Sequence, residues 1–295
     1  LTWSRVGNDI PMFITNPKSH VTAGGGINAA DAAPGTDLKP EMTNALEAGL
    51  EWRFLDDRLG INLTYYKTNT HNQFFKLPAL SGEAYAYRYE NAGNIENQGV
   101  EVSLNAYPVY GGALTWQSTV NFAHNRNRVI KLHDELREYV YGPSSFSSSY
   151  AMKLVEGGSI GDFYGYKQNN IFAYDESNAF TPDTWQQLTP VFENGSFSHY
   201  TLNGQVYNGS YVQKKLPNGK PFRGGDVNWE EAEGSRDGVI DESDRMIIGN
   251  ALPTYTGGLS TNFTYKNFGL FVSFYYSFGG QIYNYAEHQR NMFKY

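Results

Sequence analysis

The sequence of 295 residues contains no cysteine, and nowhere does it hold 18 apolar residues in a row. The first absence excludes disulfide bonds and thiolate metal sites. The second excludes a transmembrane helix but leaves open a membrane barrel, whose strands alternate apolar and polar residues. Charged residues are also scarce, at 18%, where soluble domains have about 25%. The net charge of −7 argues against nucleic acid as a partner.

What the chain does have is many aromatic residues, 16% in all, and a regular alternation of apolar and polar positions. One such stretch begins at Leu59 and runs for about a dozen residues. Its alternate positions from Leu59 are Leu, Ile, Leu and Tyr, and the residues between them are Gly, Asn, Thr and Tyr. Alternation with period two predicts a β-strand that has one apolar face. Similar stretches predict seven strands, which begin near residues 1, 46, 59, 100, 114, 259 and 268.

The connections between these strands are alternately short and long. Short turns at 54–58, 107–112 and 265–268 alternate with segments of about 35 residues before Asn44, about 25 from Asn72 to Asn97 and roughly 130 from Asn127 to Thr256. Membrane barrels have short periplasmic turns and long extracellular loops, whereas a soluble sandwich gives no reason for this pattern. The sequence therefore predicts an all-β transmembrane antiparallel barrel whose apolar face contacts lipid.

A membrane barrel predicts the domain bounds, the extracellular segment and the lipid-facing positions of the chain. Residues 1–295 belong to one barrel domain, and 127–255 form one long extracellular excursion within it. Seven strands do not close a barrel, and open edges are not tolerated in lipid, so further strands are expected outside these residues. The positions expected to face lipid are Leu50, Trp52, Leu63, Val102, Leu104, Leu114, Trp116, Phe263, Leu270, Val272 and Phe274.

Five ordered blocks of the sequence resemble the SusC/RagA-like TonB-dependent outer-membrane transporters. The blocks are LKPEMTNALEAGLEWRFLDDRLGINLTYYKTNTHNQ, NAGNIENQGVEVSLN, FYGYK, DGVIDESDRMIIGNALPTYTGGLS and YKNFGLFVSFYYSFGGQIYN, and together they cover essentially the whole chain. The resemblance implies a barrel of roughly 22 strands closed by an N-terminal plug. The plug and the TonB box are expected outside this sequence. The resemblance also implies the outer membrane of a Gram-negative bacterium and a SusD-like lipoprotein as partner on the extracellular face.

The function that the resemblance implies is active import of oligosaccharides, driven through TonB and involving no bond change. Three alternatives stay open: a RagA-type oligopeptide importer, a passive porin-like channel, and a soluble carbohydrate-binding β-sandwich. The chain contains no GxSxG, HExxH or P-loop motif. The adjacent carboxylates Glu230 and Glu231 are read as solvated loop charges rather than as a glycosidase pair. No catalytic residue is therefore expected.

One acidic stretch, EGSRDGVIDESD at 233–244, has the spacing of a calcium loop, with Gly238 at its sixth position. Its potential oxygen ligands are Glu233, Ser235, Asp237, Asp241 and Asp244. Two features depart from the pattern, because Glu at the first position is long and Asp replaces the usual bidentate Glu at the last. The alternative interpretation is an acidic surface turn without a bound ion.

Aromatic residues in the loops are candidate ligand contacts, because Tyr and Trp rings stack on sugar rings and on peptide side chains. Tyr residues alternate in AYAYRYE, with Arg88 and Glu90 on the opposite face, and again in FYGYK. The alternative is that these rings pack the loops against one another. The candidate ligand-binding residues are Tyr85, Tyr87, Tyr89, Tyr164, Tyr166 and Trp229.

Overall fold

The structure is a computed structural model. It describes residues 1–10, 18–21, 23–28, 32–33, 38–78, 85, 87–133, 137–141, 151–284, 286–287 and 290. The chain divides into two compact units. Unit 1 comprises Leu1–Tyr141, Met152–Asp162 and Asn250–Tyr295, and unit 2 comprises Gly142–Ala151 and Phe163–Gly249.

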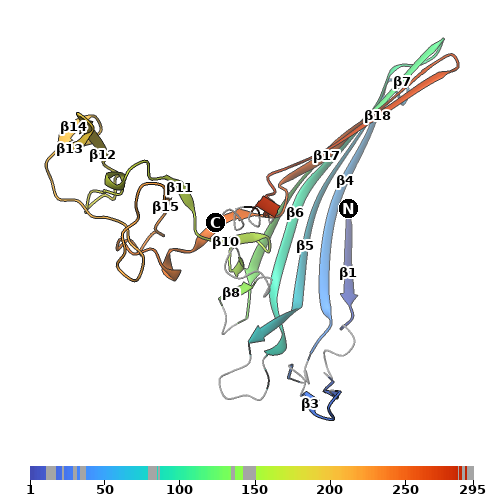
Figure 1. The fold of residues 1–295 in the computed structure, drawn as a ribbon. Helices are drawn as coiled ribbons and strands as arrows, with labels where there is room; N and C mark the ends of the chain where they lie inside the picture. The colour runs from blue at the N-terminus through green and yellow to red at the C-terminus, as the bar shows by residue number, and fades with distance from the viewer. Residues whose placement is uncertain are drawn as a thin grey trace. The chain divides into compact units, whose positions relative to one another are not determined.

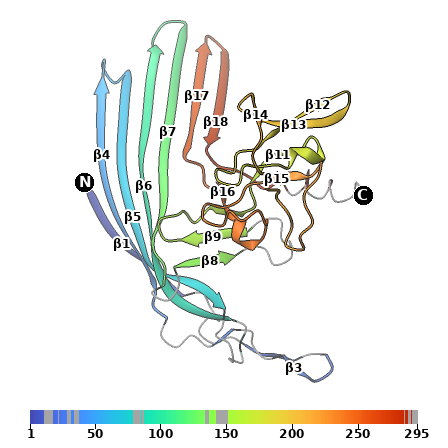
Figure 2. The same ribbon diagram turned by 90° about the vertical axis from the view of Figure 1, so that its left-hand side faces the viewer.

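Unit 1 is built on one antiparallel sheet of seven strands (Figures 1 and 2). In spatial order they are β1 (Thr2–Asn8), β4 (Glu41–Phe54), β5 (Leu59–Pro78), β6 (Tyr87–Val109), β7 (Leu114–Lys131), β17 (Tyr255–Tyr265) and β18 (Phe268–Phe278). The seven strands predicted from alternation are therefore confirmed. The neighbours β7 and β17 pair directly, although more than a hundred residues separate them in the sequence.

Backbone pairing aligns the side chains of the sheet into rows that cross six strands. From β4 to β18, one row holds Leu50, Leu63, Val102, Phe122, Gly257 and Tyr276. The adjacent row holds Glu51, Asn62, Ser103, Asn121, Gly258 and Tyr275. Because successive side chains point to opposite sides of a strand, the first row lies on an apolar face of the sheet and the second on a polar face.

The apolar face is uncovered. The eleven positions predicted to face lipid all lie on it, and none is buried. Leu50, Trp52 and Phe274 are 44%, 48% and 64% exposed. A β-sandwich would bury this face against a second sheet, and the exposed fractions show that no second sheet packs there in the described residues. The sandwich interpretation is therefore wrong.

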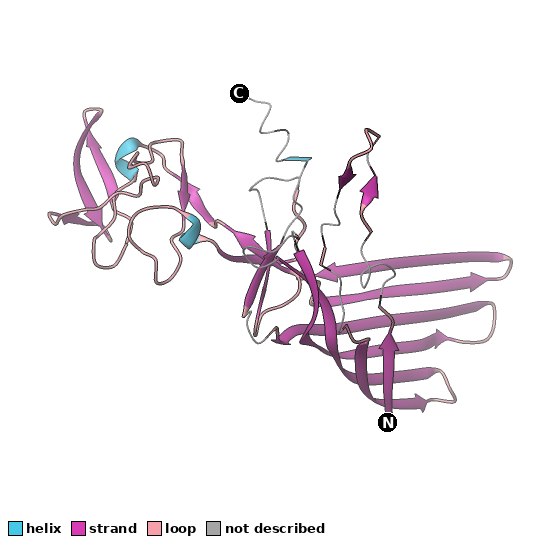
Figure 3. Ribbon diagram, turned by 90° about the horizontal axis from the view of Figure 1, so that it is seen from below, coloured by secondary structure: helices cyan, strands magenta, loops and turns pink. Residues whose placement is uncertain are grey.

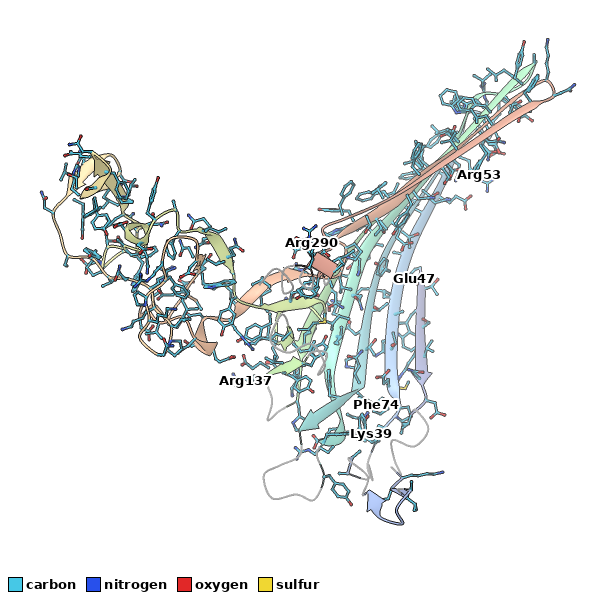
Figure 4. All side chains as sticks on the ribbon, viewed as in Figure 1. Lys39, Glu47, Arg53, Phe74, Arg137 and Arg290 are labelled. Carbon is cyan, nitrogen blue, oxygen red and sulfur yellow. The ribbon has the colours of Figure 1, made fainter. Side chains whose placement is uncertain are left out.

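One end of the sheet, here called the turn end, is closed by the short turns 55–58, 110–113 and 266–267. Asp57, Gly111 and Lys266 have positive φ angles of 65°, 94° and 51°, as tight hairpin turns require. Figure 4 places Arg53 near this end, where its guanidinium pairs with Glu51 at 2.8 Å. The predicted turns are confirmed within one residue, except that the second turn begins at 110 rather than at 107 because β6 continues to Val109.

At the opposite end, called the loop end, β5 and β6 continue far beyond the predicted strands. They stay paired as far as Pro78 and Tyr87, so the expected loop of about 25 residues between Asn72 and Asn97 was wrong. Figure 4 shows Phe74 near this end. The stretch KTNTHNQ (67–73) is polar on both faces, which removes the alternation without affecting backbone pairing. A strand crosses a bilayer in about 10 residues, so these polar ends extend beyond the apolar band.

Gly99 marks a close approach within the sheet. It pairs with Tyr66, whose hydroxyl donates to Oδ1 of Asn125 at 3.0 Å. A Cβ added at Gly99 would lie 2.3 Å from the backbone oxygen of His124 and 2.6 Å from the Tyr66 hydroxyl.

We predict that Gly99→Ala lowers the free energy of unfolding by about 3 kcal/mol, measured by urea titration of the intact protein in a bilayer. A Cβ added at Gly49 would meet nothing closer than 3.8 Å, so Gly49→Ala is the matched control. Equal effects of the two variants would contradict the prediction.

The loop end of unit 1 carries a small apolar core. Val129, Leu132 and Leu154 are buried there, next to the hairpin of β8 (Glu138–Tyr141) and β9 (Ala151–Val155). The short pair β2 (His20–Val21) and β3 (Ile27–Asn28) belongs to the same unit. Within the described residues, no helix is both long enough and apolar enough to span a membrane.

Unit 2 consists mainly of short strands and loops (Figure 3). It has apolar cores of its own. Its elements are β10 (Asp162–Gly165), β11 (Gln168–Ile171), η1 (Asp175–Ser177), β12 (Thr189–Glu193), β13 (Ser196–Leu202), β14 (Gln205–Tyr207), β15 (Val227–Trp229), η2 (Glu242–Asp244) and β16 (Met246–Asn250). Strands β12, β13 and β14 form a meander. Its two turns are Asn-Gly pairs at 194–195 and 203–204, with all four φ angles positive, which is the strongest short-range hairpin signal.

Unit 2 is an insertion whose two ends meet. The chain enters it in β10 and leaves it in β16. Within unit 1, Nδ2 of Asn250 donates to Oδ1 of Asp162 at 2.7 Å, and the Ala251 amide donates to the Gly161 carbonyl at 2.8 Å. The insertion therefore lies between β7 and β17 in the sequence, but the two strands still pair directly in the sheet.

Candidate functional site

The polar face of the sheet contains a hollow of about 490 Å³. Its polar lining includes Asn62, Glu101, Ser103, Asn121 and Ser260. Hydroxyl and amide groups both donate and accept hydrogen bonds, and a carboxylate accepts them, so the hollow can bind uncharged polar molecules or water.

The candidate tyrosines of the AYAYRYE stretch lie at the loop end of unit 1. Tyr87 and Tyr89 are in β6, and their rings make an edge contact with centroids 5.7 Å apart. Tyr85 is outside the strands and 36% exposed. Arg88 and Glu90 form an ion pair with each other. The alternation that the sequence shows is therefore present as a strand only from Tyr87 onward, and Tyr87 and Tyr89 are half-buried there.

The other candidate aromatics belong to unit 2, where two of them contribute to packing. Tyr166 and Trp229 contact each other with ring centroids 6.0 Å apart, and both pack against the buried cluster that includes Phe172 and Phe180. The guanidinium of Arg245 lies 5.3 Å from the Tyr166 ring. Tyr164 lies in β10 and is half-buried. For Tyr166 and Trp229, these contacts match the packing interpretation that the sequence left open.

In the acidic loop at 233–244, carboxylate groups accept hydrogen bonds from nearby backbone amides and from a serine hydroxyl of the same loop. Asp244 is fully buried, and it accepts hydrogen bonds from Ala232 N, Ser235 Oγ and Asp241 N at 3.2, 2.8 and 2.9 Å. Asp237 accepts from Val239 N at 2.7 Å. Glu233 is exposed. In the part of the chain that the structure describes, no three His, Asp or Glu side chains are placed to hold one metal ion.

Unit 2 contains a pocket that the sequence did not indicate. Its volume is about 310 Å³. Its walls come from four separate segments, and the lining residues are Asn169, Phe180, Thr184, Trp185, Lys214, Glu230, Glu231 and Arg236.

A buried lysine forms one side of this pocket. Lys214 is only 5% exposed, and its ammonium group donates to Oδ1 of Asn228 at 3.1 Å and to the Trp229 carbonyl. The same group lies 4.8 Å from the centroid of the Phe180 ring. Burial lowers the pKa of Lys214, although the neighbouring carboxylates, Glu231 first among them, oppose this shift. The backbone of Lys214 is held by Asn178, which is fully buried and bonds both its amide and its carbonyl.

A buried carboxylate lies on the pocket as well. Glu231 is 5% exposed, and its Oε2 accepts a hydrogen bond from the Gly238 amide at 3.1 Å. Its Oε1 is buried and has no hydrogen-bond partner within the protein. Burial raises the pKa of Glu231, and the backbone amides of Gly238 and Asp237 together with Lys214 only partly oppose it. A buried carboxylate with an unsatisfied oxygen destabilises the fold, which makes this residue a candidate for a role in binding.

We predict that Glu231→Gln removes a pH dependence from the stability of unit 2. Because the folded-state pKa of Glu231 is raised above its ordinary value of 4.5, the folded unit holds this proton more tightly than the unfolded chain does. Stability therefore falls as the pH rises from about 4.5 through the folded-state pKa. Hydrogen exchange of unit 2 peptides should show this fall in wild type, whereas the variant should lose it and be more protected at neutral pH.

The control for this experiment is Glu233→Gln, which neutralises an exposed carboxylate two residues away. It is expected to keep the wild-type dependence on pH. If Glu231→Gln and wild type gave the same protection at every pH, the buried carboxylate would not be the source of the effect.

The pocket was missed in the sequence because nothing along the chain links its residues. In the sequence Glu231 is half of an adjacent carboxylate pair and Lys214 is one of two adjacent lysines, whereas Trp185 and Arg236 stand singly in polar segments. The backbone of Trp185 has a positive φ angle of 53°, but this conformation is not visible in the sequence.

Comparison with known proteins places these features in context. Residues 5–291 match the family model described as TonB dependent receptor-like, beta-barrel. TonB-dependent receptor P39 of Formosa agariphila is 36% identical over 97% of this chain and 26% of its own length. TonB-dependent receptor SusC of Bacteroides thetaiotaomicron is 25% identical over 94% of this chain and 24% of its own. The solved RagAB peptide transporter has a TM-score of 0.64 at 19% identity, and the match covers 94% of this chain and 26% of that one. The chain thus spans about a quarter of the length of the relatives it matches.

Proposed function

The chain belongs to the TonB-dependent receptor β-barrel family, and on that premise we propose that it is part of an importer of oligosaccharides in a bacterial outer membrane. Members of this family are transporters rather than enzymes, and their barrels are proteins of the Gram-negative outer membrane. The observation that carries the proposal is the seven-stranded sheet with one exposed apolar face and one polar face.

The apolar face supports a position in the membrane. A row of apolar side chains runs across six strands, and its members Leu50, Leu63 and Phe122 remain exposed. Exposure of so much apolar surface to water is unfavourable, and a lipid environment removes that cost. On this orientation the polar face turns inward, and its hydrogen-bonding hollow faces the lumen of the complete barrel.

The parity of the strands supports an extracellular excursion. Because β7 and β17 are antiparallel neighbours, residues 127–255 begin and end at the loop end of the sheet. The short connections, which barrels of this kind keep on the periplasmic side, all lie at the turn end. We therefore place unit 2 outside the cell, where it can meet cargo and a surface lipoprotein of the SusD type.

The charge of the excursion favours neutral cargo. Residues 163–249 hold twelve Asp or Glu against seven Lys or Arg, so anionic chains are repelled. The aromatic rings and amide groups suit stacking and hydrogen bonding with sugar hydroxyls. Oligopeptides are the second candidate cargo, and the likeness of the fold to the RagAB peptide transporter favours them. In both cases energy is supplied through TonB, and the cargo is transferred from the lipoprotein.

Growth of a deletion strain tests the proposal. Removing the gene is expected to abolish growth on one or more neutral glycans as sole carbon source, and the intact gene should restore it. Growth should also stop when TonB or the partner lipoprotein is removed. Uptake that persists without both proteins would support the porin-like alternative, and a growth defect confined to peptides would support the peptide importer.

A further inference from the structure

We propose that the pocket in unit 2 is a binding site for a single neutral sugar ring. The proposal goes beyond transport, because the site is formed by unit 2 side chains alone and needs neither the barrel lumen nor TonB. The residues that carry it are Trp185, Lys214, Glu231 and Arg236.

The buried carboxylate of Glu231 is the first observation that favours a ligand at this site. This side chain is 95% buried, since only 5% is exposed, and Oε1 has no partner while Oε2 is held by the Gly238 amide. Most buried polar atoms in folded proteins have a hydrogen-bond partner. A hydroxyl group of a ligand in the pocket would donate to Oε1 and remove this deficit.

The charges around the pocket favour a neutral ligand with many hydroxyl groups. Two cations, Lys214 and Arg236, line it together with two carboxylates, Glu230 and Glu231. Glu230 is already paired with Lys167 at 2.8 Å. Because these charges balance, a ligand with a net charge gains no net attraction from them, whereas hydroxyl groups both donate to carboxylates and accept from cations.

Two aromatic side chains line the pocket together with these polar groups. Trp185 and Phe180 contact each other with ring centroids 6.1 Å apart, and both line the pocket. The positive φ angle of Trp185 is an unusual backbone conformation for a large side chain, and such strain concentrates at functional sites. An indole face suits the apolar C–H face of a pyranose. The volume of about 310 Å³ is at the lower end of ligand pockets, roughly 300–1,000 Å³, and so accommodates one ring rather than a chain.

Calorimetric titration of the intact, detergent-solubilised transporter tests the site. The probes are the methyl glycosides of glucose, galactose, mannose and xylose. Glucuronate is the anionic comparison, and the zwitterionic dipeptide Gly-Gln is the peptide comparison. At least one neutral glycoside is expected to bind. Trp185→Ala and Glu231→Gln should each weaken that binding about tenfold, because one removes a ring contact and the other a charge-assisted hydrogen bond. Trp185→Phe should retain most of the affinity.

The matched control is Tyr174→Ala, which removes a 54% exposed ring of the same unit that does not line the pocket, and it should leave the affinity unchanged. Absence of binding by all four glycosides would overturn the proposal, as would equal affinity in wild type, Trp185→Ala and Glu231→Gln, or binding of only glucuronate or Gly-Gln. The result is separable from the transport proposal: glycoside binding without TonB-dependent growth would sustain this site alone, and growth without binding would sustain import alone.

Discussion

A transporter that lacks residues 163–249 is expected to assemble its barrel and to lose import. The structure permits this deletion because Asp162 and Asn250 are hydrogen-bonded at 2.7 Å, so a short Gly-Ser linker can join them without strain. The pairing of β7 with β17, from Leu114–Tyr265 to His124–Tyr255, does not involve the deleted residues. Unit 2 also has apolar clusters of its own.

Loss of import is expected to be complete, so uptake should fall to the level of the gene-deletion strain. The reason is that the excursion is proposed to hold cargo outside the barrel, and no other described segment supplies an insertion of comparable size. Uptake of radiolabelled glycan measures import. Altered migration of the unheated protein in a detergent gel measures barrel assembly. Normal uptake by the shortened protein would show that unit 2 has no part in transport.

Leu63→Arg is expected to destabilise the barrel by about 2–4 kcal/mol. Leu63 lies on the apolar face, paired with Leu50 on one side and Val102 on the other. On the proposed orientation, an arginine there places a charge in the hydrocarbon region of the membrane, where no water solvates it. Urea titration of the protein refolded into phospholipid vesicles measures the change in the free energy of unfolding.

The matched control for Leu63→Arg is Asn62→Arg, one residue away in β5. Asn62 belongs to the polar face and lines its hollow, so an arginine there meets polar groups and should change stability by less than about 1 kcal/mol. Two adjacent positions in one strand thus receive the same substitution in opposite environments. A similar loss of stability for both variants would contradict the assignment of the two faces.

The sequence was sufficient to predict the sheet because its faces differ in polarity. At Leu59–Tyr65, alternate positions must satisfy two different surroundings, and this requirement leaves a period-two pattern. Beyond Asn72 both faces are polar, so the pattern disappears although the strands continue to Pro78 and Tyr87. Prediction of strand ends fails wherever backbone pairing alone maintains the strand.

Unit 2 could be predicted only in part. Its Asn-Gly turns are visible in the sequence, because their positive φ angles restrict residue choice. The direction of a side chain is not restricted in this way: Asp244 has the spacing of a calcium ligand but is turned inward to bond Ala232, Ser235 and Asp241. The pocket around Glu231 depends on four segments that meet only in three dimensions, and no local pattern encodes it.

The central claim is that alternate residues of the sheet face lipid, and a single-cysteine scan of β5 tests it most directly. The described chain has no cysteine of its own, so each residue from Leu59 to Tyr66 can be replaced in turn in the intact, otherwise cysteine-free protein. Spin labels are attached, and their accessibility to lipid-soluble oxygen and to a water-soluble nickel chelate is measured in bilayers. The account predicts period-two accessibility, with oxygen favoured at Leu59, Ile61, Leu63 and Tyr65 and reduced at the positions between them. Uniform accessibility along the strand, or preference for the nickel chelate at Leu63, would contradict it.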